Sequence, residues 1–179
     1  MLVPVLVGGA AVAVAALAVF QPWRLFVDVE VVEALPTSAA SAPPTATAPS
    51  TTSAEPSPQP TAPVVLATGR FVTHEHPTTG TVRVLELPDG SRVLRIEGLD
   101  TTNGPDLRVW LSDQPVLEGR DGWFVFDDGA YVELGELKGN RGDQNYALPA
   151  DVDLDALSSV SIWCARFSVS FGAASLAAA

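Results

Sequence analysis

Cysteine is nearly absent from this chain, because Cys164 is the only one among 179 residues. A single thiol excludes an intramolecular disulfide framework and an internal dithiol redox cycle. Three kinds of thiol chemistry remain: oxidation to a sulfenic acid, a mixed disulfide with another molecule, and ligation of a metal ion or haem iron. The alternative is that Cys164 packs as a small buried hydrophobic residue.

Positive charge is also scarce, since 10 Lys and Arg face 21 Asp and Glu and the formal net charge is −11. Nucleic acid binding requires a basic groove, so we expect no nucleic acid partner. The sequence lacks a Gly-rich phosphate loop, a G-x-S-x-G elbow, a C-x-x-C motif and a pair of helical zinc ligands. These absences argue against a conventional enzyme and leave a redox or electron-transfer role open.

Charged residues are missing from residues 2–20, which are almost entirely apolar. Nineteen helical residues reach roughly 28 Å, close to the hydrocarbon thickness of a bilayer. The run predicts one transmembrane helix, so that residues 1–24 form an uncleaved transmembrane anchor or signal-anchor. A signal peptide cleaved after the small residues Ala16-Leu17-Ala18 is the alternative. In either case the membrane is the first expected partner.

Apolar bulk is missing again between residues 36 and 63, a segment that holds eight of the fifteen prolines. Such a composition cannot bury a core. We therefore predict a disordered linker rich in Pro, Ser, Thr and Ala over residues 25–63. As a stalk it would hold the C-terminal domain away from the cell membrane. Stalks of this composition commonly stand on the outer face, so we expect an extracytoplasmic domain on a single-pass anchor.

The remaining residues, 64–179, have the period-two alternation of β-strands and no convincing helix. We expect an all-β domain, an antiparallel β-sandwich or barrel. A hairpin should span residues 80–97 around Pro88-Asp89-Gly90. In it Leu94 and Ile96 should face the core, and Arg92, Arg95 and Glu97 should be mostly solvated. Further strands are expected at 70–76, 107–111, 131–138, 145–148 and 160–171, with an edge strand at 123–128.

The expected long strand over residues 160–171 sets the predicted surroundings of Cys164. Alternation places Trp163, Ala165, Phe167, Val169 and Phe171 on the core side. Cys164 then lies on the other side, beside Arg166. The charge of Arg166 would favour the thiolate and make Cys164 a reactive or ligating thiol.

Both histidines of the chain, His74 and His76, lie two residues apart, which is a usable spacing for metal ligands. Together with Cys164 they would supply the two-His, one-Cys ligand set of a blue-copper site. The sequence lacks the histidine and methionine that blue-copper proteins place shortly after the cysteine. A solvated surface pair is therefore the alternative.

Six collinear motifs run through residues 69–176, and they are HPTTGTV from His76, DGS from Asp89, GPDL from Gly104, LGELKG from Leu134, QNYALP from Gln144 and SVSIWC from Ser159. In this order they resemble the electron-transfer DM-thirteen (DM13) domain family. The resemblance implies an all-β extracytoplasmic module with a redox role centred on the cysteine that Cys164 matches.

The resemblance also suggests which other residues belong to the site. His76 matches the family's His-Pro position, so His76 is the expected partner of Cys164 in binding a cofactor, with haem or copper as candidates. Asp106, Tyr146 and Trp163 match family positions as supporting residues, and Arg166 supports the thiol by its charge. Two functions stay open: an electron-transfer module with a redox partner protein, and a non-catalytic binding or structural module at the cell surface.

Overall fold

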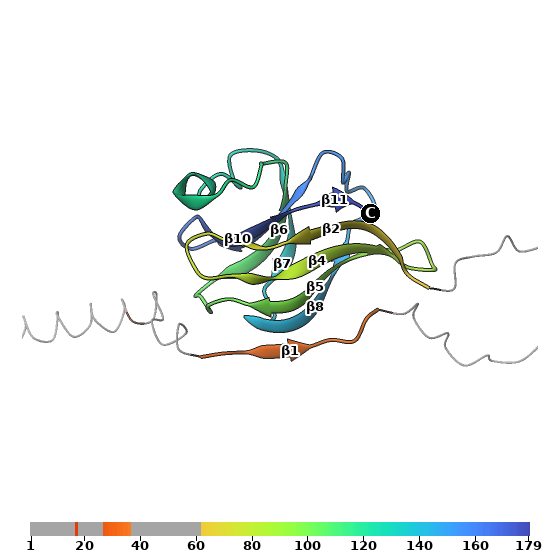
Figure 1. The fold of residues 1–179 in the computed structure, drawn as a ribbon, viewed down its shortest axis with the longest axis horizontal. Coiled ribbons are helices and arrows are strands. Elements are labelled where there is room, and N and C mark those ends of the chain that lie inside the picture. Colours follow the sequence, from red (N-terminus) through yellow and green to blue (C-terminus); the bar gives the residue numbers. More distant parts are fainter. Residues whose placement is uncertain (1–16, 18–26, 37–61) are drawn as a thin grey trace, which may run out of the picture.

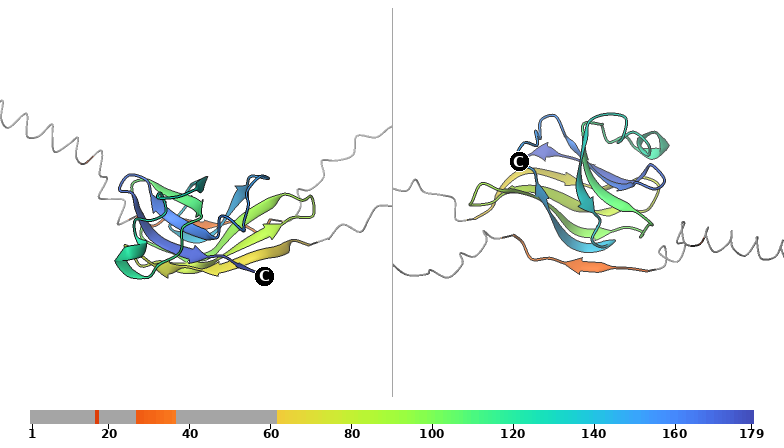
Figure 2. Two further views of the ribbon diagram at one scale, coloured as in Figure 1. Left: turned by 90° about the horizontal axis from the view of Figure 1, so that it is seen from above. Right: turned by 180° about the vertical axis from the view of Figure 1, so that it is seen from behind.

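The computed structural model describes Leu17, residues 27–36 and residues 62–179. The described part is all-β and consists of two sheets that do not close into a barrel (Figures 1 and 2). One sheet has six strands in the order β1-β8-β5-β4-β2-β11, and the other has five in the order β3-β10-β9-β6-β7. The strands are β1 (Glu30–Val32), β2 (Val64–Arg70), β3 (Val72–Thr73), β4 (Thr79–Glu86), β5 (Arg92–Asp100), β6 (Leu107–Ser112), β7 (Tyr131–Glu136), β8 (Arg141–Leu148), β9 (Ser159–Cys164), β10 (Val169–Ser175) and β11 (Ala177–Ala178).

Alternating side chains divide the buried residues into two clusters. The main core takes apolar residues from both sheets, including Val84, Leu94 and Ile162. Trp163 lies between Ile162 and Cys164 in β9, so its side chain emerges on the opposite face of the five-stranded sheet. There it packs with Trp110, Phe126 and Ala173 in a second cluster. Phe126 comes from the long connection between β6 and β7, which covers this outer face.

The predicted hairpin over residues 80–97 is confirmed as β4 and β5. Gly90 adopts φ 82° in the turn, and the Leu87 N–H donates to the Ser91 carbonyl at 2.8 Å. The predicted core positions Leu94 and Ile96 are fully buried.

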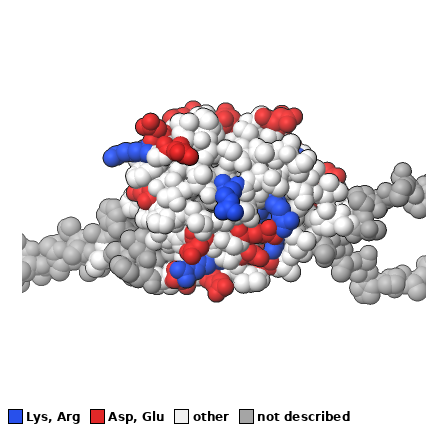
Figure 3. Space-filling view, viewed as in Figure 1, with Lys and Arg blue, Asp and Glu red and all other residues white. Residues whose placement is uncertain are grey.

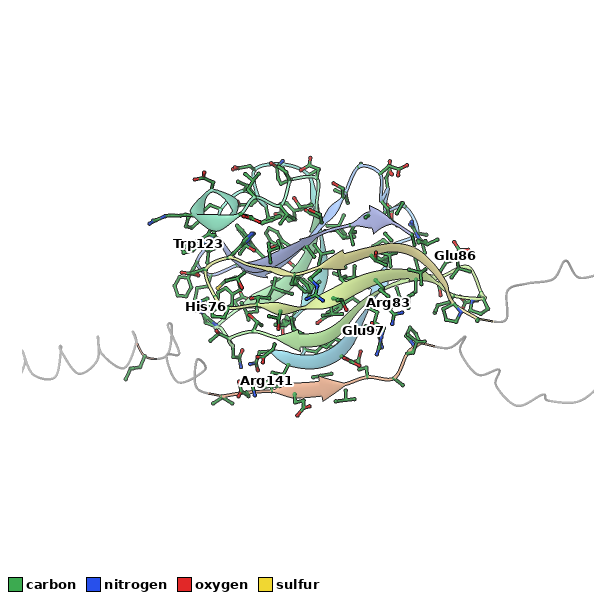
Figure 4. All side chains as sticks on the ribbon, viewed as in Figure 1. His76, Arg83, Glu86, Glu97, Trp123 and Arg141 are labelled. Atoms are coloured by element: carbon green, nitrogen blue, oxygen red, sulfur yellow. The ribbon has the colours of Figure 1, made fainter. Side chains whose placement is uncertain are left out.

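The expectation that Arg95 is solvated was wrong, because its side chain is buried. It forms ion pairs with Glu97 at 2.7 Å and Asp143 at 3.0 Å. Glu97 also pairs with Arg83, and Figure 4 shows these two side chains beside each other. On this face acidic and basic side chains are intermixed (Figure 3). These ion pairs thus compensate the Arg95 side chain for the hydration that it loses on burial.

The single strand expected over residues 160–171 was also wrong. The chain reverses over residues 165–168, and β9 pairs antiparallel with β10. Ser168 adopts φ 48° in this turn, and Ala165 and Phe167 are exposed instead of lying in the core. The strand predicted at residues 123–128 is absent from the described structure, where these residues form turns after the short 3₁₀ helix η2 (Gly119–Gly122). Strand β2 was not predicted.

Residues 27–36 were assigned to the disordered linker, but the structure shows them docked on the domain. Strand β1 pairs in parallel with β8, placing Glu30 opposite Arg141 at the sheet edge (Figure 1). Asn140 accepts from the Val29 N–H at 2.7 Å, and Lys138 forms an ion pair with Glu33 at 2.7 Å. The polypeptide therefore contacts the domain before residues 37–61 begin.

The predicted transmembrane helix over residues 1–24 falls, apart from Leu17, outside the described residues. The same holds for the linker residues 37–61. Among the residues that the structure describes, no helix is long and apolar enough to span a membrane.

Candidate functional site

Cys164 ends β9 and is completely buried. In the five-stranded sheet it lies opposite Val169 of β10 and Leu107 of β6. All three side chains belong to the main core between the sheets. The predicted position of Cys164 at a wet face opposite the core was therefore wrong, because the expected ladder of core residues included exposed turn residues.

Two opposing effects act on the Cys164 thiol. Burial raises its pKa, because the apolar surroundings disfavour the charged thiolate. Hydrogen bonds from the backbone N–H groups of Phe167, Arg166 and Asp106 act in the opposite direction. We call these three N–H groups, each of which lowers the thiol pKa, the amide cradle. The Phe167 N–H also donates to the Cys164 carbonyl at 3.2 Å. Burial prevails, so the neutral thiol is the resting form.

Arg166 does not act on the thiol in the way that the sequence suggested. Its side chain is exposed in the turn after β9, and it lowers the thiol pKa through its backbone N–H. The expectation that a guanidinium charge lowers the thiol pKa is replaced by backbone hydrogen bonding. Residue 166 keeps a role at the site, but that role does not depend on its side chain.

Asp106 ties the loop before β6 to the turn after Cys164. Its carbonyl accepts from the Ala165 N–H at 2.9 Å, and its carboxylate accepts from Arg108 Nε at 2.7 Å. The Asp106 carboxylate also raises the thiol pKa by its negative charge. The loop lines a small pocket of about 170 Å³, formed by Asn103, Gly104, Pro105, Asp106, Leu107, Glu136 and Leu137. Cys164 thus lies beside a pocket-forming loop without being open to it.

His76 lies near this end of the domain but is not bonded to Cys164. Its ring packs at a tilt of 36° against Phe171 with 3.9 Å between ring centroids, and its Nε2 lies 3.7 Å from Glu75 Oε2. Phe171 packs into the main core against Gly104. Burial lowers the His76 pKa, and Glu75 opposes this change. Figure 4 shows His76 and Trp123 at one end of the sandwich and Glu86 at the other.

His74 belongs to the second cluster, not to the surroundings of Cys164. The imidazole is buried, bonded through Nδ1 to Ser170 Oγ at 2.8 Å and through Nε2 to the Leu117 carbonyl at 3.1 Å. It also stacks on Phe126. Both ring nitrogens are therefore occupied on the outer face of the five-stranded sheet, while Cys164 faces the inner core. The predicted two-histidine, one-cysteine copper set is not assembled.

Neither cofactor candidate fits the described residues in this conformation. They contain no group of three or more His, Cys, Asp or Glu side chains placed to hold a metal ion. The pocket beside Cys164, at about 170 Å³, is smaller than the roughly 300–1,000 Å³ of typical small-molecule sites, and a haem macrocycle would not enter it. His76 and Cys164 are therefore separate features of the same end of the domain.

Tyr146 and Trp163, the remaining supporting residues, have structural surroundings. The Tyr146 hydroxyl donates to Gln144 Oε1 at 2.8 Å and accepts from the Lys138 N–H at 3.1 Å. Burial raises the Tyr146 pKa to about 12. Trp163 lies in the second cluster and stacks on Trp110 with 5.0 Å between centroids. Both residues are buried.

The amide cradle and the second cluster could not be found from local sequence motifs. The cradle consists of backbone groups, and two of its three N–H donors lie in a turn that contains neither glycine nor proline. The one available signal was the GPDL motif, whose Asp106 supplies the third N–H.

Comparison with known proteins agrees with the motifs around Cys164. No curated protein and no solved structure matches the chain significantly. The family model described as electron transfer DM13 matches residues 70–176, which include β4 to β10, the pocket loop and Cys164. This match covers more than half of the chain, and the protein therefore belongs to the electron transfer DM13 family.

Proposed function

We propose that this protein is a membrane-anchored, extracytoplasmic electron-transfer module whose redox centre is the sulfur of Cys164. The amide cradle is the observation that carries the proposal. Three backbone N–H groups lower the pKa of this one thiol, and the Ala165 N–H, which donates to the Asp106 carbonyl at 2.9 Å, joins the two segments that carry them. Hydrogen bonds to the charged form of a group favour that form, and the thiolate is the reactive form of cysteine. Family membership supports an electron-transfer role in general.

The cradle gives the thiol two states with different reactivity. In the closed structure Sγ is buried and protonated, so it is protected from adventitious oxidation. Displacement of the loop at Asn103–Leu107 would admit water or a partner, and the burial penalty would fall. The N–H groups of Phe167 and Arg166 belong to the turn and stay in place. They would stabilise the thiolate, whose proton passes to water. The thiolate would then lose one electron to an oxidised partner protein and become a thiyl radical.

The docked N-terminal strand supports a membrane-proximal position for Cys164. Val27 lies at the pocket end of the sandwich, since its carbonyl accepts from Asn103 Nδ2 at 3.1 Å. Only six residues, 21–26, separate Val27 from the end of the apolar run at Phe20, a span of at most roughly 25 Å. With that run in the bilayer, the end that carries Cys164 and His76 would face the membrane. A redox partner in the membrane would be within reach.

A stoichiometric oxidation experiment tests the redox centre. The full chain, reduced and purified in detergent, is mixed with ferricyanide, and the electrons delivered per chain are counted from ferricyanide absorbance. We expect slow delivery that depends on Cys164 and is lost in Cys164→Ala. Ser161→Ala is the matched control, because it changes a buried residue of β9 and keeps the thiol. Equal delivery by wild type and Cys164→Ala would overturn Cys164 as the centre.

A binding or structural module at the cell surface is the second candidate, and the complete burial of Cys164 favours it. The same experiment separates the two functions. If native protein delivers no electrons and only unfolded protein reacts, Cys164 is a packing residue. The pocket loop at Asn103–Leu107 would then be the better candidate for ligand binding.

A further inference from the structure

Four aromatic residues outside the Cys164 site form a continuous series of ring contacts on the outer face of the five-stranded sheet. Tyr131 stacks on Trp110 with 4.1 Å between centroids and 5° between ring planes. Trp110 stacks on Trp163 at 5.0 Å and 25°. Phe126 meets Trp163 edge to face at 6.3 Å. The first three rings, which we call the aromatic stack, are the residues in this series that one-electron oxidants attack.

The aromatic stack runs from solvent to the interior. Tyr131 is 46% exposed, Trp110 6% and Trp163 1%. Its inner end, Trp163, is the residue before Cys164 in β9. Trp110 and Trp163 lie on neighbouring strands, β6 and β9, and Tyr131 begins β7. Three paired strands therefore hold the rings in order.

A carboxylate is positioned to take the proton that an oxidised indole releases. Trp110 Nε1 donates to Glu133 Oε2 at 3.4 Å. Arg108 holds the same carboxylate, with Nη1 donating to Glu133 Oε1 at 2.8 Å. The indole at the middle of the stack is therefore supplied with a fixed proton acceptor, an arrangement that apolar packing does not require.

We propose that Tyr131, Trp110 and Trp163 form a one-electron path between the protein surface and the buried end of β9. Indole and phenol rings are the protein side chains that most readily lose one electron, and rings in contact exchange electrons by short steps. When an external one-electron oxidant removes an electron from Trp163, Trp110 transfers one electron to the oxidised Trp163 ring. Tyr131 then transfers one electron to the oxidised Trp110 ring and releases its phenolic proton to water. The net change is one electron to the oxidant, one proton to water and a neutral tyrosyl radical at Tyr131.

This path goes beyond the proposed function, because it would operate whether or not Cys164 is a redox centre. It identifies the surface around Tyr131 as the place where a one-electron reactant exchanges electrons with the protein. The competing explanation is that the rings only pack against one another, since stacked aromatic pairs also stabilise folds. Transfer kinetics distinguish the two, because packing alone moves no electron to Tyr131.

Laser photoionisation of the full chain in detergent tests the path. An ultraviolet flash ejects electrons from indoles, buried ones included, and dissolved nitrous oxide removes the ejected electrons. Transient absorption then follows tryptophanyl and tyrosyl radicals through their separate bands. We expect tryptophanyl radicals to decay in wild type as a tyrosyl radical appears at the same rate. Tyr131→Phe should abolish this tyrosyl signal, and Trp110→Phe should abolish or greatly slow its formation.

The chain offers matched controls, because it contains only two tyrosines, Tyr131 and Tyr146. Tyr146→Phe should leave the tyrosyl signal unchanged. Trp123→Phe should also leave it unchanged, because Trp123 contacts Phe124 and Arg120 rather than the stack. Tyr131 is exposed, so its variant tests the path even if Trp110→Phe does not fold. An equal tyrosyl yield in Tyr131→Phe and wild type would overturn the proposal, as would an unchanged rate in folded Trp110→Phe.

Discussion

At Cys164, burial and hydrogen bonding act on one sulfur in opposite directions, and the balance predicts its reactivity. Because burial raises the thiol pKa, the native protein should react with iodoacetamide far more slowly than a free thiol at pH 8. The labelling rate should rise only at more alkaline pH. Arg166→Ala should leave this profile unchanged, because the backbone N–H of residue 166 remains. Labelling rates between pH 7 and 10, with denatured protein as reference, provide the measurement.

Rapid labelling of the native thiol at neutral pH would contradict this account of the site.

The raised pKa of the Cys164 thiol also has a consequence for stability. The folded state binds the thiol proton more tightly than the unfolded chain does. Protonation of Cys164 therefore contributes to the unfolding free energy below the unfolded pKa of about 8.5, and this contribution is lost as pH rises further. Cys164→Ser places a hydroxyl in this apolar site and should cost about 1–3 kcal/mol of unfolding free energy.

The lowered pKa values of His74 and His76 predict that the unfolding free energy depends on pH. Burial lowers the pKa of both imidazoles, so the unfolded chain binds protons more readily than the folded one. Their contribution is therefore present above about pH 6.5 and is lost as pH falls through the lowered folded pKa. We expect the unfolding free energy to decrease from pH 7 to pH 5. The slope should be smaller in His74→Gln, with urea unfolding at each pH as the measurement.

At the scale of elements, the β9–β10 hairpin predicts unequal costs for two aromatic deletions. Trp163 is almost fully buried in the second cluster, whereas Phe167 is 47% exposed in the turn. Trp163→Ala should therefore cost about 3–5 kcal/mol. Phe167→Ala should cost only about 0.5 kcal/mol. Urea unfolding of both variants checks the ranking, and equal costs would contradict the observed turn.

The same hairpin shows where local sequence information was sufficient and where it was not. Strands β4 and β5 were predictable, because a Pro-Asp-Gly turn separates two alternating segments. The break between β9 and β10 was not, because residues 165–168 carry no glycine or proline and Ser168 adopts the left-handed conformation. Arg95 was expected in water because its partners, Asp143 and the carbonyls of Glu33 and Ala34, lie far away in sequence.

The sequence was sufficient to predict Cys164 as the candidate site residue, but it was not sufficient to predict the burial and the neighbours of Cys164. The unpaired Cys164 and the surrounding motifs identified the family, which the family model confirms. The orientation of Cys164 depended on the length of its strand, and that strand was predicted too long. The amide cradle depends on backbone N–H groups that tertiary contacts bring together, so residue types alone do not reveal it.

At the scale of the whole molecule, β1 and its neighbouring residues are held on the domain by noncovalent contacts. Glu33 forms an ion pair with Lys138 and accepts from the Asn145 N–H, and Arg95 donates to the carbonyls of Glu33 and Ala34. A protease site introduced within residues 37–61 should therefore allow cleavage without release of the domain. Detergent-solubilised full chain should elute as one particle after the cut.

The control for this prediction weakens the docked strand itself. Asn140 binds Val29, Asp28 and the Thr101 carbonyl, so Asn140→Ala removes three contacts at once. In that variant the cleaved fragments should separate on size-exclusion chromatography. Immediate separation of the cleaved wild-type fragments would show that β1 contributes little to holding the segment.

The edge of β8 accepts β1 by backbone pairing, and such pairing does not distinguish β1 of its own chain from β1 of a neighbour. In the sequence, residues 37–61 join β1 to the rest of its domain. Deleting most of these residues would favour exchange of β1 between two chains, because a short connection prevents the strand from returning to its own domain while the same pairing remains available. The length of this connection would then decide between pairing within one chain and strand-swapped dimers.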